Sequence, residues 1–508
     1  MGTENTLGGS ADELEQYLPL AEAGNAFAQN KVGDCYYEGK GVEKNIDKAV
    51  YWYKLAAANG NAEAQYSIGY AYYYGEGVGK DLEVAFGYFK KSAEAGVSAA
   101  QKRLGDCYYY GDGVDEDSEE AFAWYTKAAK QNNLYAVGRL GDCYYYGDGV
   151  EKDYKKAAEC YGKAAEGGVT SAYYSIGYCY FCGAGVEKDY IKAAYWYTKG
   201  AEKGDEDAQY SLGKCYYNGY GVAVDYEKAV YWYKKAAEQG QMWAQNNLGV
   251  CYNNGDGVAR DRNEAFKWYL KSAEQDNPVA QNNVGFYYEH GFGTQADINK
   301  AIYWYEKAIA QGNIEAYYNL GCLYLDGDAF TADYDKAFEL LGKAANKGHK
   351  GAQFSYGRCY LLGKGTQKDM LQAAYWWQKA AENGHVAAMC NLGSCYYNGD
   401  GIQKDYAKAF YWLTKGAEAG NDKAQRNLGQ CYEKGAGTAK DVARAIYWYE
   451  KAAAQNNTGA LDSLAAIYFY GSGVAADKNK AKEYWSKSAR LGDKFAKEIL
   501  KDRFGIKF

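Results

Sequence analysis

The chain is poor in proline, in histidine and in long apolar runs. It has 508 residues but only two prolines and three histidines. Proline interrupts helices because it lacks the backbone N–H and clashes with the preceding turn, so its scarcity suits a chain made mostly of helix interiors. No apolar run approaches the roughly 20 residues that a membrane-spanning helix needs, so we expect no membrane insertion.

The sequence also lacks the usual signatures of metal and nucleophile chemistry. It contains no HExxH motif. Its one CxxC pair, Cys179 and Cys182, has no second pair to complete the four ligands of a zinc site. A histidine-based triad would have to involve His290, and nothing near it suggests one. The paired glycines of the loops follow helices rather than strands, which argues against a phosphate-binding loop. We therefore predict a protein that is not an enzyme and that has no cofactor and no metal site.

The charge balance restricts the partners. The formal net charge is −7 and the sequence pI is about 5.4, whereas nucleic-acid binding depends on clustered Lys and Arg that neutralise phosphates. We therefore expect no nucleic-acid partner. The first residues show neither the basic segment nor the apolar segment of a secretory signal, so we expect a cytoplasmic protein.

What the sequence does contain is one unit repeated thirteen times. From Gly33 onward, a glycine recurs every 36 residues without insertion or deletion, and Ala465 takes its place in the last repeat. We call this residue the origin glycine and number positions from it. The origin glycines are Gly33, Gly69, Gly105, Gly141, Gly177, Gly213, Gly249, Gly285, Gly321, Gly357, Gly393 and Gly429. Thirteen copies in register predict a repeat array, in which each repeat packs on its neighbours.

Each repeat reads as two helices. The first, helix A, carries the origin glycine and a tyrosine at position +3 in all thirteen repeats, and ends at a glycine such as Gly39. The second, helix B, begins after an Asp or Asn such as Asp81, because these side chains cap orphan backbone N–H groups. Helix B ends at glycine in ten repeats and at Asn132, Asp276 or Asn456 in the others. Asn and Asp tolerate the left-handed conformation best after glycine.

The pattern AxxxLGxxYxxGxGVxxDxxKAxxWYxKAAxxGxxxA resembles the Sel-one-like repeat (SLR) family, which is related to tetratricopeptide repeats. The resemblance covers residues 25–492. It implies an all-α fold, namely a right-handed superhelical α/α solenoid of thirteen 36-residue two-helix repeats with terminal capping helices. We expect residues 1–24 to form a tail with a partial capping helix, residues 25–492 to form one continuous solenoid, and residues 493–508 to form a C-terminal capping helix.

Nine of the thirteen cysteines share position +2 of helix A. They are Cys35, Cys107, Cys143, Cys179, Cys215, Cys251, Cys359, Cys395 and Cys431. Ala71 and Leu323 fill the same position elsewhere, which indicates a buried apolar site with structural thiols. One cysteine-rich branch of the family staples helix B to the next helix A with a disulfide, but alanines such as Ala57 and Ala64 stand at those positions here. Reduced thiols suit a reducing compartment.

The resemblance also implies where a ligand lies, since helix A lines the concave side of tetratricopeptide-like stacks. Positions −6, −3, +1, +4 and +5 share one face of helix A, and their residues vary between repeats. We predict a partner-binding groove lined by Tyr66, Tyr70, Tyr73, Asp106, Tyr109, Asp142, Tyr145, Tyr174, Tyr178, Phe181, Tyr210, Lys214, Tyr217, Trp243, Asn246, Asn253, Asn282, Phe286, Tyr318, Phe354, Arg358, Tyr397 and Arg426. The residues at +4 serve equally well for packing between repeats.

Asp34, Asp106 and Asp142 lie near the N-terminal end of this groove and Arg358 and Arg426 near the other, so we expect its charge to change from acidic to basic. Family members are mostly adaptors and scaffolds, which implies a protein or peptide ligand. Tyr and Asn suit such a surface, because they combine rigid contact area with adaptable hydrogen bonds. The alternative is a glycan, whose sugar rings would stack on the tyrosines. The sequence does not identify the partner.

Overall fold

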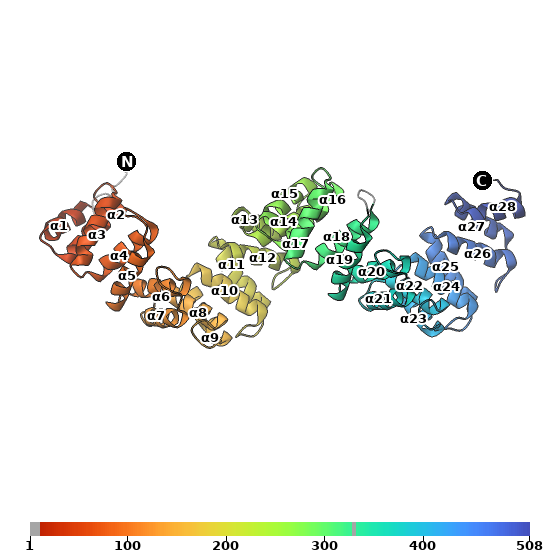
Figure 1. Ribbon diagram of the computed structural model, residues 1–508, viewed down its shortest axis with the longest axis horizontal. Coiled ribbons are helices and arrows are strands. Elements are labelled where there is room, and N and C mark those ends of the chain that lie inside the picture. The colour runs from red at the N-terminus through yellow and green to blue at the C-terminus, as the bar shows by residue number, and fades with distance from the viewer. Residues whose placement is uncertain (1–10, 328–331, 508) are drawn as a thin grey trace, which may run out of the picture. The chain divides into compact units, whose positions relative to one another are not determined.

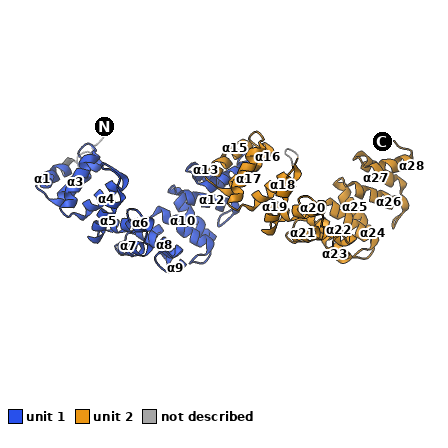
Figure 2. Cartoon of the chain, viewed as in Figure 1, with its two compact units in different colours: residues 1–261 blue, residues 262–508 orange. Residues whose placement is uncertain are grey.

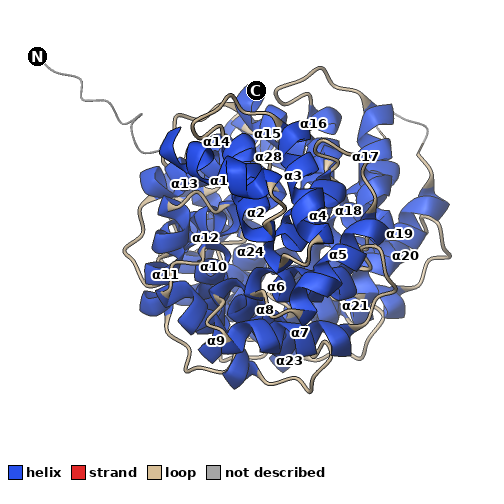
Figure 3. Cartoon of the chain, turned by 90° about the vertical axis from the view of Figure 1, so that its left-hand side faces the viewer, coloured by secondary structure: helices blue, strands red, loops and turns tan. Residues whose placement is uncertain are grey.

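The computed structural model describes residues 11–327 and 332–507, and within these ranges the chain folds into helices joined by loops, with no strand (Figures 1 and 3). The predicted all-α repeat fold is confirmed. None of the described helices combines the length and the hydrophobicity that crossing a membrane requires. Residues 1–10, which belong to the predicted N-terminal tail, and residues 328–331 and 508 lie outside the described residues.

The chain divides into two compact units, Met1–Asp261 and Arg262–Phe508 (Figure 2). The even-numbered helices from α2 to α26 are the A helices and the odd-numbered helices from α3 to α27 are the B helices. The first unit contains α1 (Ala11–Glu22), α2 (Ala26–Glu38), α3 (Ile46–Ala58), α4 (Ala62–Tyr74), α5 (Leu82–Glu94), α6 (Ser98–Tyr110), α7 (Ser118–Lys130), α8 (Leu134–Tyr146), α9 (Tyr154–Glu166), α10 (Thr170–Cys182), α11 (Tyr190–Glu202), α12 (Glu206–Asn218), α13 (Tyr226–Glu238) and α14 (Met242–Asn254). That the repeats form one continuous solenoid stays a prediction.

The second unit continues the same alternation of A and B helices. It contains α15 (Arg262–Glu274), α16 (Pro278–His290), α17 (Ile298–Ala310), α18 (Ile314–Asp326), α19 (Tyr334–Asn346), α20 (Lys350–Leu362), α21 (Met370–Glu382), α22 (Val386–Asn398), α23 (Tyr406–Glu418), α24 (Asp422–Lys434), α25 (Val442–Ala454), α26 (Thr458–Tyr470), α27 (Lys478–Arg490) and α28 (Lys494–Phe504). Within each unit, every helix packs on the next one in the chain.

The helix ends follow the chemistry that the sequence predicts. Asp81 caps helix B of the second repeat, where its carboxylate accepts the N–H of Val84 at 3.0 Å. Helix A ends at a glycine in the left-handed region, such as Gly75 with φ 77°. The three exceptions at the end of helix B also have positive φ, which is 59° at Asn132, 61° at Asp276 and 64° at Asn456. The prediction for these positions is confirmed.

The origin glycine makes room for a side chain of helix B. A Cβ built on Gly33 would lie 2.6 Å from Cε1 of Tyr53, and the same relationship holds between Gly69 and Phe89 at 2.8 Å. The residue at position +20 therefore presses its ring or branched side chain against bare backbone. What approaches this glycine is therefore a side chain of helix B and not a second backbone.

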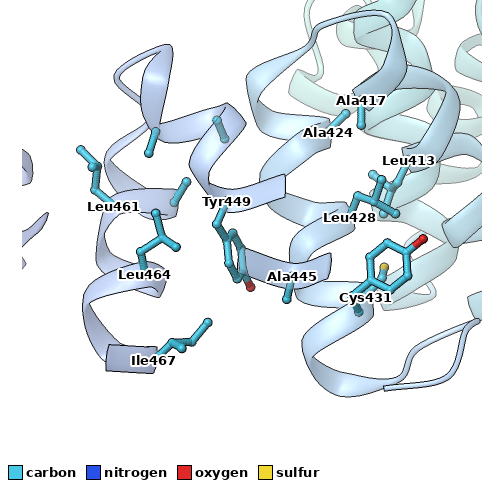
Figure 4. Packing of buried hydrophobic residues seen from close by; sticks show 14 of the residues in the cluster. Leu413, Ala417, Ala424, Leu428, Cys431, Ala445, Tyr449, Leu461, Leu464 and Ile467 are labelled. Carbon is cyan, nitrogen blue, oxygen red and sulfur yellow. The ribbon is translucent and has the colours of Figure 1, made fainter. Parts of the chain in front are cut away.

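The core consists of these side chains together with small residues of both helices. In the second unit, Tyr449 lies between Leu428 of helix A and Leu464 of the next repeat (Figure 4). All nine cysteines at position +2 are buried and unpaired, so the prediction of a buried apolar position is confirmed. The core side chains of one repeat pack against those of the next. The residue type at helix A positions that face the next repeat is therefore constrained by this packing.

The chain ends carry one helix each. The helix α1 runs through Pro19, and its Ala21 is buried against Ala28 and Val32 of the first A helix. At the other end, Ala496 and Leu500 of α28 pack on Trp485 of the last B helix. These helices cover the outer faces of the first and last repeats, as capping elements of a solenoid do.

Candidate functional site

The A helices of successive repeats meet along one side of each unit. Such contacts join α10 with α12, α16 with α18, α18 with α20, and α22 with α24. We call this side the helix A face. The residues at −6, −3, +1, +4 and +5 lie on it, and the following paragraphs describe which of them reach solvent.

Four of the predicted groove residues are exposed: Tyr178, Trp243, Phe286 and Arg426. Most of the others are only partly exposed, because each is wedged between its own A helix and a neighbouring helix. These half-buried residues are Tyr66, Tyr70, Tyr73, Tyr109, Asp142, Tyr145, Tyr174, Phe181, Tyr210, Lys214, Tyr217, Asn253, Tyr318, Phe354, Arg358 and Tyr397. Several of these rings contact the core directly, since Tyr66 lies 5.9 Å from the buried ring of Phe89 between centroids.

Three predicted groove residues are buried, and we correct their assignment. Asp106 exposes 2% of its surface, while Asn246 and Asn282 are also inaccessible. Asn282 accepts a hydrogen bond from the amide of Asn319 in the next repeat, at 3.0 Å. These three side chains lie in the interface between successive A helices, so they serve that interface and are not open to a ligand in this structure.

The three carboxylates at the predicted acidic end of the groove accept hydrogen bonds from helix B. A buried helix B tyrosine donates its phenolic O–H to each of Asp34 (from Tyr53, 3.0 Å), Asp106 (from Tyr125, 3.0 Å) and Asp142 (from Tyr161, 2.9 Å). Burial raises the pKa of both Asp34 and Asp142. These carboxylates lie at the bottom of the interface between repeats rather than on an open acidic surface.

The tyrosines at +4 join one repeat to the loop of the next. Tyr73 donates to Asp112 at 2.7 Å and Tyr109 donates to Asp148 at 2.9 Å. The hydrogen bond to Asp112 raises the pKa of Tyr73 to about 12. Tyr217 makes the equivalent bond to Asp256 at 2.8 Å. Of the two alternatives for +4, the structure supports packing between repeats for these three residues.

Three exposed tyrosines stand one position further on, at +5. Tyr74, Tyr110 and Tyr146 expose 50%, 51% and 61% of their surface in three consecutive repeats. Each ring packs edge-on against the tyrosine at +4, with centroids 4.9, 4.9 and 5.0 Å apart. We call these three residues the tyrosine row. Position +5 was among the predicted groove positions, but these residues were not singled out.

Two arginines at position −2 complete the helix A face, and the sequence reasoning missed them. The guanidinium of Arg103 lies over the rings of Tyr70 and Tyr73, 5.1 and 4.5 Å from their centroids, and donates to the hydroxyl of Tyr74 at 2.9 Å. It also lies 3.6 Å from Asp106. One repeat later, Arg139 bridges Asp106 at 3.6 Å and Asp142 at 3.3 Å. The available signal was that Arg occurs at −2 in only these two repeats.

These contacts define a recurring space between successive A helices. It is bounded by positions +1, +4 and +5 of one repeat and by positions −2 and +1 of the next, and we call it the inter-repeat niche. Arg103 and Arg139 fill two of the niches. Between repeats 1 and 2, where Ser67 stands at −2, the niche is a cavity of about 290 Å³. Between repeats 6 and 7, where Asn247 stands at −2, a cavity of about 220 Å³ occupies the same position.

The B helices expose a second set of aromatic residues on the opposite side of the repeats. A tyrosine at +18 is about half exposed in seven repeats, and its ring packs edge-on against the following tryptophan. These residues are Tyr51, Tyr195, Tyr231, Tyr303, Tyr375, Tyr411 and Tyr447. The sequence signal was the Tyr-Trp pair that recurs in helix B.

Reactive groups are few on either face. Burial raises the pKa of Cys107 to about 12, so the thiolate that a nucleophile requires is scarce at neutral pH. No group of three metal-ligating side chains occurs within the described ranges. His349 and His385 cap A helices, where Nδ1 accepts a backbone N–H at 3.0 and 3.2 Å.

Comparison with known proteins agrees with this architecture. The sequence matches the Sel1 repeat model over thirteen segments, 26–61, 62–97, 98–133, 134–169, 170–205, 206–241, 244–277, 278–313, 314–349, 351–385, 386–421, 422–457 and 460–493. None of the curated proteins matches it.

Among solved structures, the chain is similar to c5321, a protective antigen present in uropathogenic Escherichia coli strains that displays an SLR fold. The two share 34% identity with a TM-score of 0.70, over 97% of this chain and 98% of that one. A Sel1 repeat protein from Oxalobacter formigenes shares 32% identity with a TM-score of 0.48, over 62% of this chain and 92% of that one. With Sel1 repeats over nearly its whole length, the chain belongs to the Sel1 repeat family.

Proposed function

We propose that this chain is a non-catalytic scaffold that binds a protein or peptide along its helix A face. Solenoids built of such repeats typically mediate protein interactions, because stacked helices present an extended surface without consuming it in folding. The finer assignment, that the partner contacts the A helices of the first unit, rests on the exposed residues of that face.

The observation that carries the proposal is the tyrosine row. Tyr74, Tyr110 and Tyr146 occupy the same helical position in consecutive repeats, and each is at least half exposed. Their orientation is held by the rings at +4, two of which are in turn hydrogen-bonded to the next repeat. Rigid tyrosines lose little conformational entropy on binding, which makes them effective contact residues.

The alternative ligand is a glycan, since sugar rings stack on exposed aromatic faces. At position +5 the repeats that follow the tyrosine row carry Cys182, Asn218 and Asn254, and amides next to aromatic rings also suit a glycan. Yet the row is confined to three repeats, and such a short aromatic patch fits an anchoring contact with a protein better than a long polysaccharide track.

The experiment is affinity capture with the purified chain, followed by mass spectrometry, beside a glycan array. A variant with Tyr74, Tyr110 and Tyr146 changed to Ala tests the row. The matched control changes Tyr51, Tyr195 and Tyr231 to Ala, because these helix B tyrosines are exposed to a similar extent, 57%, 54% and 51%. We expect one saturable protein partner whose binding falls at least tenfold in the first variant and stays within twofold in the control.

If binding falls in the helix B control and not in the tyrosine-row variant, the binding surface lies on helix B and the proposal is refuted. Glycan binding without a captured protein would replace the scaffold with the glycan alternative. Thermal unfolding of both variants, monitored by circular dichroism, provides the check that the loss of binding does not follow from a loss of folding.

We also propose that the protein works in a reducing compartment such as the cytoplasm. The nine thiols at +2 are buried and unpaired, and buried thiols of this kind persist where disulfides do not form. Intact-mass measurement after alkylation under denaturing conditions, on protein from its natural source, should count thirteen free thiols. Paired cysteines would refute this assignment.

A further inference from the structure

The residue at position −2 decides whether an inter-repeat niche is open. Arg103 and Arg139 each place a guanidinium into the niche that their repeat forms with the preceding one. Ser67 at the same position is too short to do so, and a cavity of about 290 Å³ remains. The chain therefore shows the same niche in a filled and an open form, and the filled form reveals which chemical group the niche accepts.

The open niche is formed by the same four positions as the niche of Arg103, with a tyrosine at +4 in both. Arg103 contacts the residues at +1, +4 and +5 of the preceding repeat and the residue at +1 of its own repeat. The residues at these four positions around Ser67 are Asp34, Tyr37, Glu38 and Tyr70, and all four line the cavity.

Asp34 lacks the cation that its counterpart Asp106 receives from the next repeat. Asp106 pairs with Lys102 and lies 3.6 Å from Arg103, both in its own repeat, and it lies 3.6 Å from Arg139 of the next. Asp34 lies 3.5 Å from Lys31 of its own repeat, and the next repeat supplies Ser67 instead of an arginine. Burial raises the pKa of Asp34, and a second cation in the niche would favour its charged form.

All the charged residues that line the open niche are acidic. Asp34, Glu38 and Glu76 line it, and none of its lining residues is cationic. Glu38 pairs with Lys40 outside the cavity, and Glu76 accepts the phenolic O–H of Tyr37 at 3.1 Å. Tyrosine faces add attraction for a cation, because the ring quadrupole is negative on its face.

Two other cavities differ in this respect. Lys214 lines the cavity between repeats 6 and 7. The cavity of about 330 Å³ beside Asp142 and Ser175 is not bounded by the residues at +4 and +5, and it is lined by Lys102 and Arg139 as well as by Asp142, Asp205 and Asp207. An incoming cation would meet resident positive charge at both places, whereas all the charged residues that line the niche beside Ser67 are carboxylates.

We propose that the niche between repeats 1 and 2 binds the guanidinium of an arginine side chain presented by the protein partner. The inference rests on the proposed scaffold function and names one feature of the partner, an exposed arginine. The guanidinium would lie over the aromatic ring at +4, as Arg103 does over Tyr73, and against the carboxylate at +1 of the preceding repeat, as Arg139 does against Asp106.

The test is a titration of the full chain with N-acetyl-L-arginine N-methylamide, followed by methyl NMR. Ile46 and Val50 line the cavity, so their methyl signals report occupancy. We expect saturable shifts of these signals, and at least tenfold weaker binding of the citrulline analogue, which has the same shape without the charge. Equal binding of the two probes, or no shift at Ile46 and Val50, would overturn the proposal.

Variants of the niche provide the matched controls. Ser67→Arg should fill the niche from within and abolish the probe-induced shifts, while Ser211→Arg, at the same position of repeat 6, should leave them unchanged. Asp34→Asn keeps an acceptor for Tyr53 and should weaken binding at least fivefold. Unchanged binding in both Ser67→Arg and Asp34→Asn would refute the site. If the captured partner still needs the tyrosine row, the scaffold function stands without the arginine niche.

Discussion

The phenolic ring of Tyr125 lies against the backbone of Gly105, so closely that a Cβ on Gly105 would be 2.6 Å from Cε1 of the ring. The ring is buried and its hydroxyl donates to Asp106, the residue that follows Gly105. One side chain of helix B thus packs on helix A and donates a hydrogen bond to a buried carboxylate next to the contact. The origin glycine and the acid at +1 act together in fixing the angle between the two helices of the repeat.

Gly105→Ala should destabilise the protein although alanine favours helices. The added methyl must displace the Tyr125 ring, and overpacking of this kind costs about 1–3 kcal/mol. Gly87 offers a matched control, because it lies inside helix α5 and a Cβ there meets no atom within 4 Å. Gly87→Ala should stabilise by about 0.5–1 kcal/mol. Urea unfolding followed by circular dichroism measures both, and a neutral Gly105→Ala would contradict the packing described.

Tyr125→Phe should destabilise the protein through Asp106. Removal of the hydroxyl takes away a charge-assisted hydrogen bond of 3.0 Å to a buried carboxylate, and such bonds contribute about 1.5–3 kcal/mol. Tyr197→Phe is the comparison, since its repeat has Tyr178 rather than a carboxylate at +1. We expect a loss below about 1 kcal/mol there. Equal losses in denaturant unfolding would show that the carboxylate is not the reason.

Acid should weaken repeats 10 and 11 through His385. Its Nδ1 accepts the N–H of Ala388 at 3.2 Å and its ring stacks on Phe354, so the neutral form caps the helix. Burial, followed by the charges of Lys350 and His349, lowers the pKa of His385 below 6.5. Because the folded pKa is depressed, the stabilisation is fully present above pH 6.5 and is lost as the pH falls through the lower, folded value.

His385→Asn should reduce this pH dependence, because asparagine caps other A helices, as at Asn61 and Asn133, without titrating. The measurement is the difference in melting temperature between pH 7.5 and pH 5 for both proteins. A larger drop in the natural chain supports the prediction. Identical drops would show that carboxylates elsewhere account for the acid sensitivity.

Asn132→Ala should cost stability at the end of helix α7. Asn132 has φ 59°, and a left-handed conformation costs an ordinary residue about 1–2 kcal/mol. Lys130→Ala, an exposed position in the last turn of the same helix, should change stability by no more than about 0.5 kcal/mol. Thermal unfolding of the pair distinguishes backbone strain from a simple loss of surface polarity.

Local features of the fold could be read from the sequence because each depends on a few adjacent residues. The caps at Asp81 and Gly75 and the positive φ at Asn132 follow from the conformational preferences of single residues. The exposure of groove residues could not be read in this way. The carboxylate of Asp106 contacts Lys102, Arg103 and Tyr125 of its own repeat and also Arg139 of the next. No periodicity within one repeat contains this last contact.

The same limit explains the mixed outcome for the tyrosines. Tyr73 and Tyr74 are adjacent in the sequence and of one residue type, yet the first is tied to Asp112 of the next repeat and the second is half exposed. Their difference arises from the angle at which successive A helices meet, which only the folded structure reveals. Positions +4 and +5 could be predicted as one face, but not divided into interface and surface.

A substitution between serine and arginine at position −2 changes whether the niche can bind a ligand. Residues 103–114 are repeated without change as residues 139–150, so duplication of this segment copies the arginine together with the carboxylate that it neutralises. Duplication thus lengthens the molecule without adding an unpaired charge. A single codon change from arginine to serine at −2 instead removes the paired cation and leaves an open acidic niche, while the rest of the array is unaltered. Ligand preference in such a protein can therefore evolve one repeat at a time, while the framework stays constant.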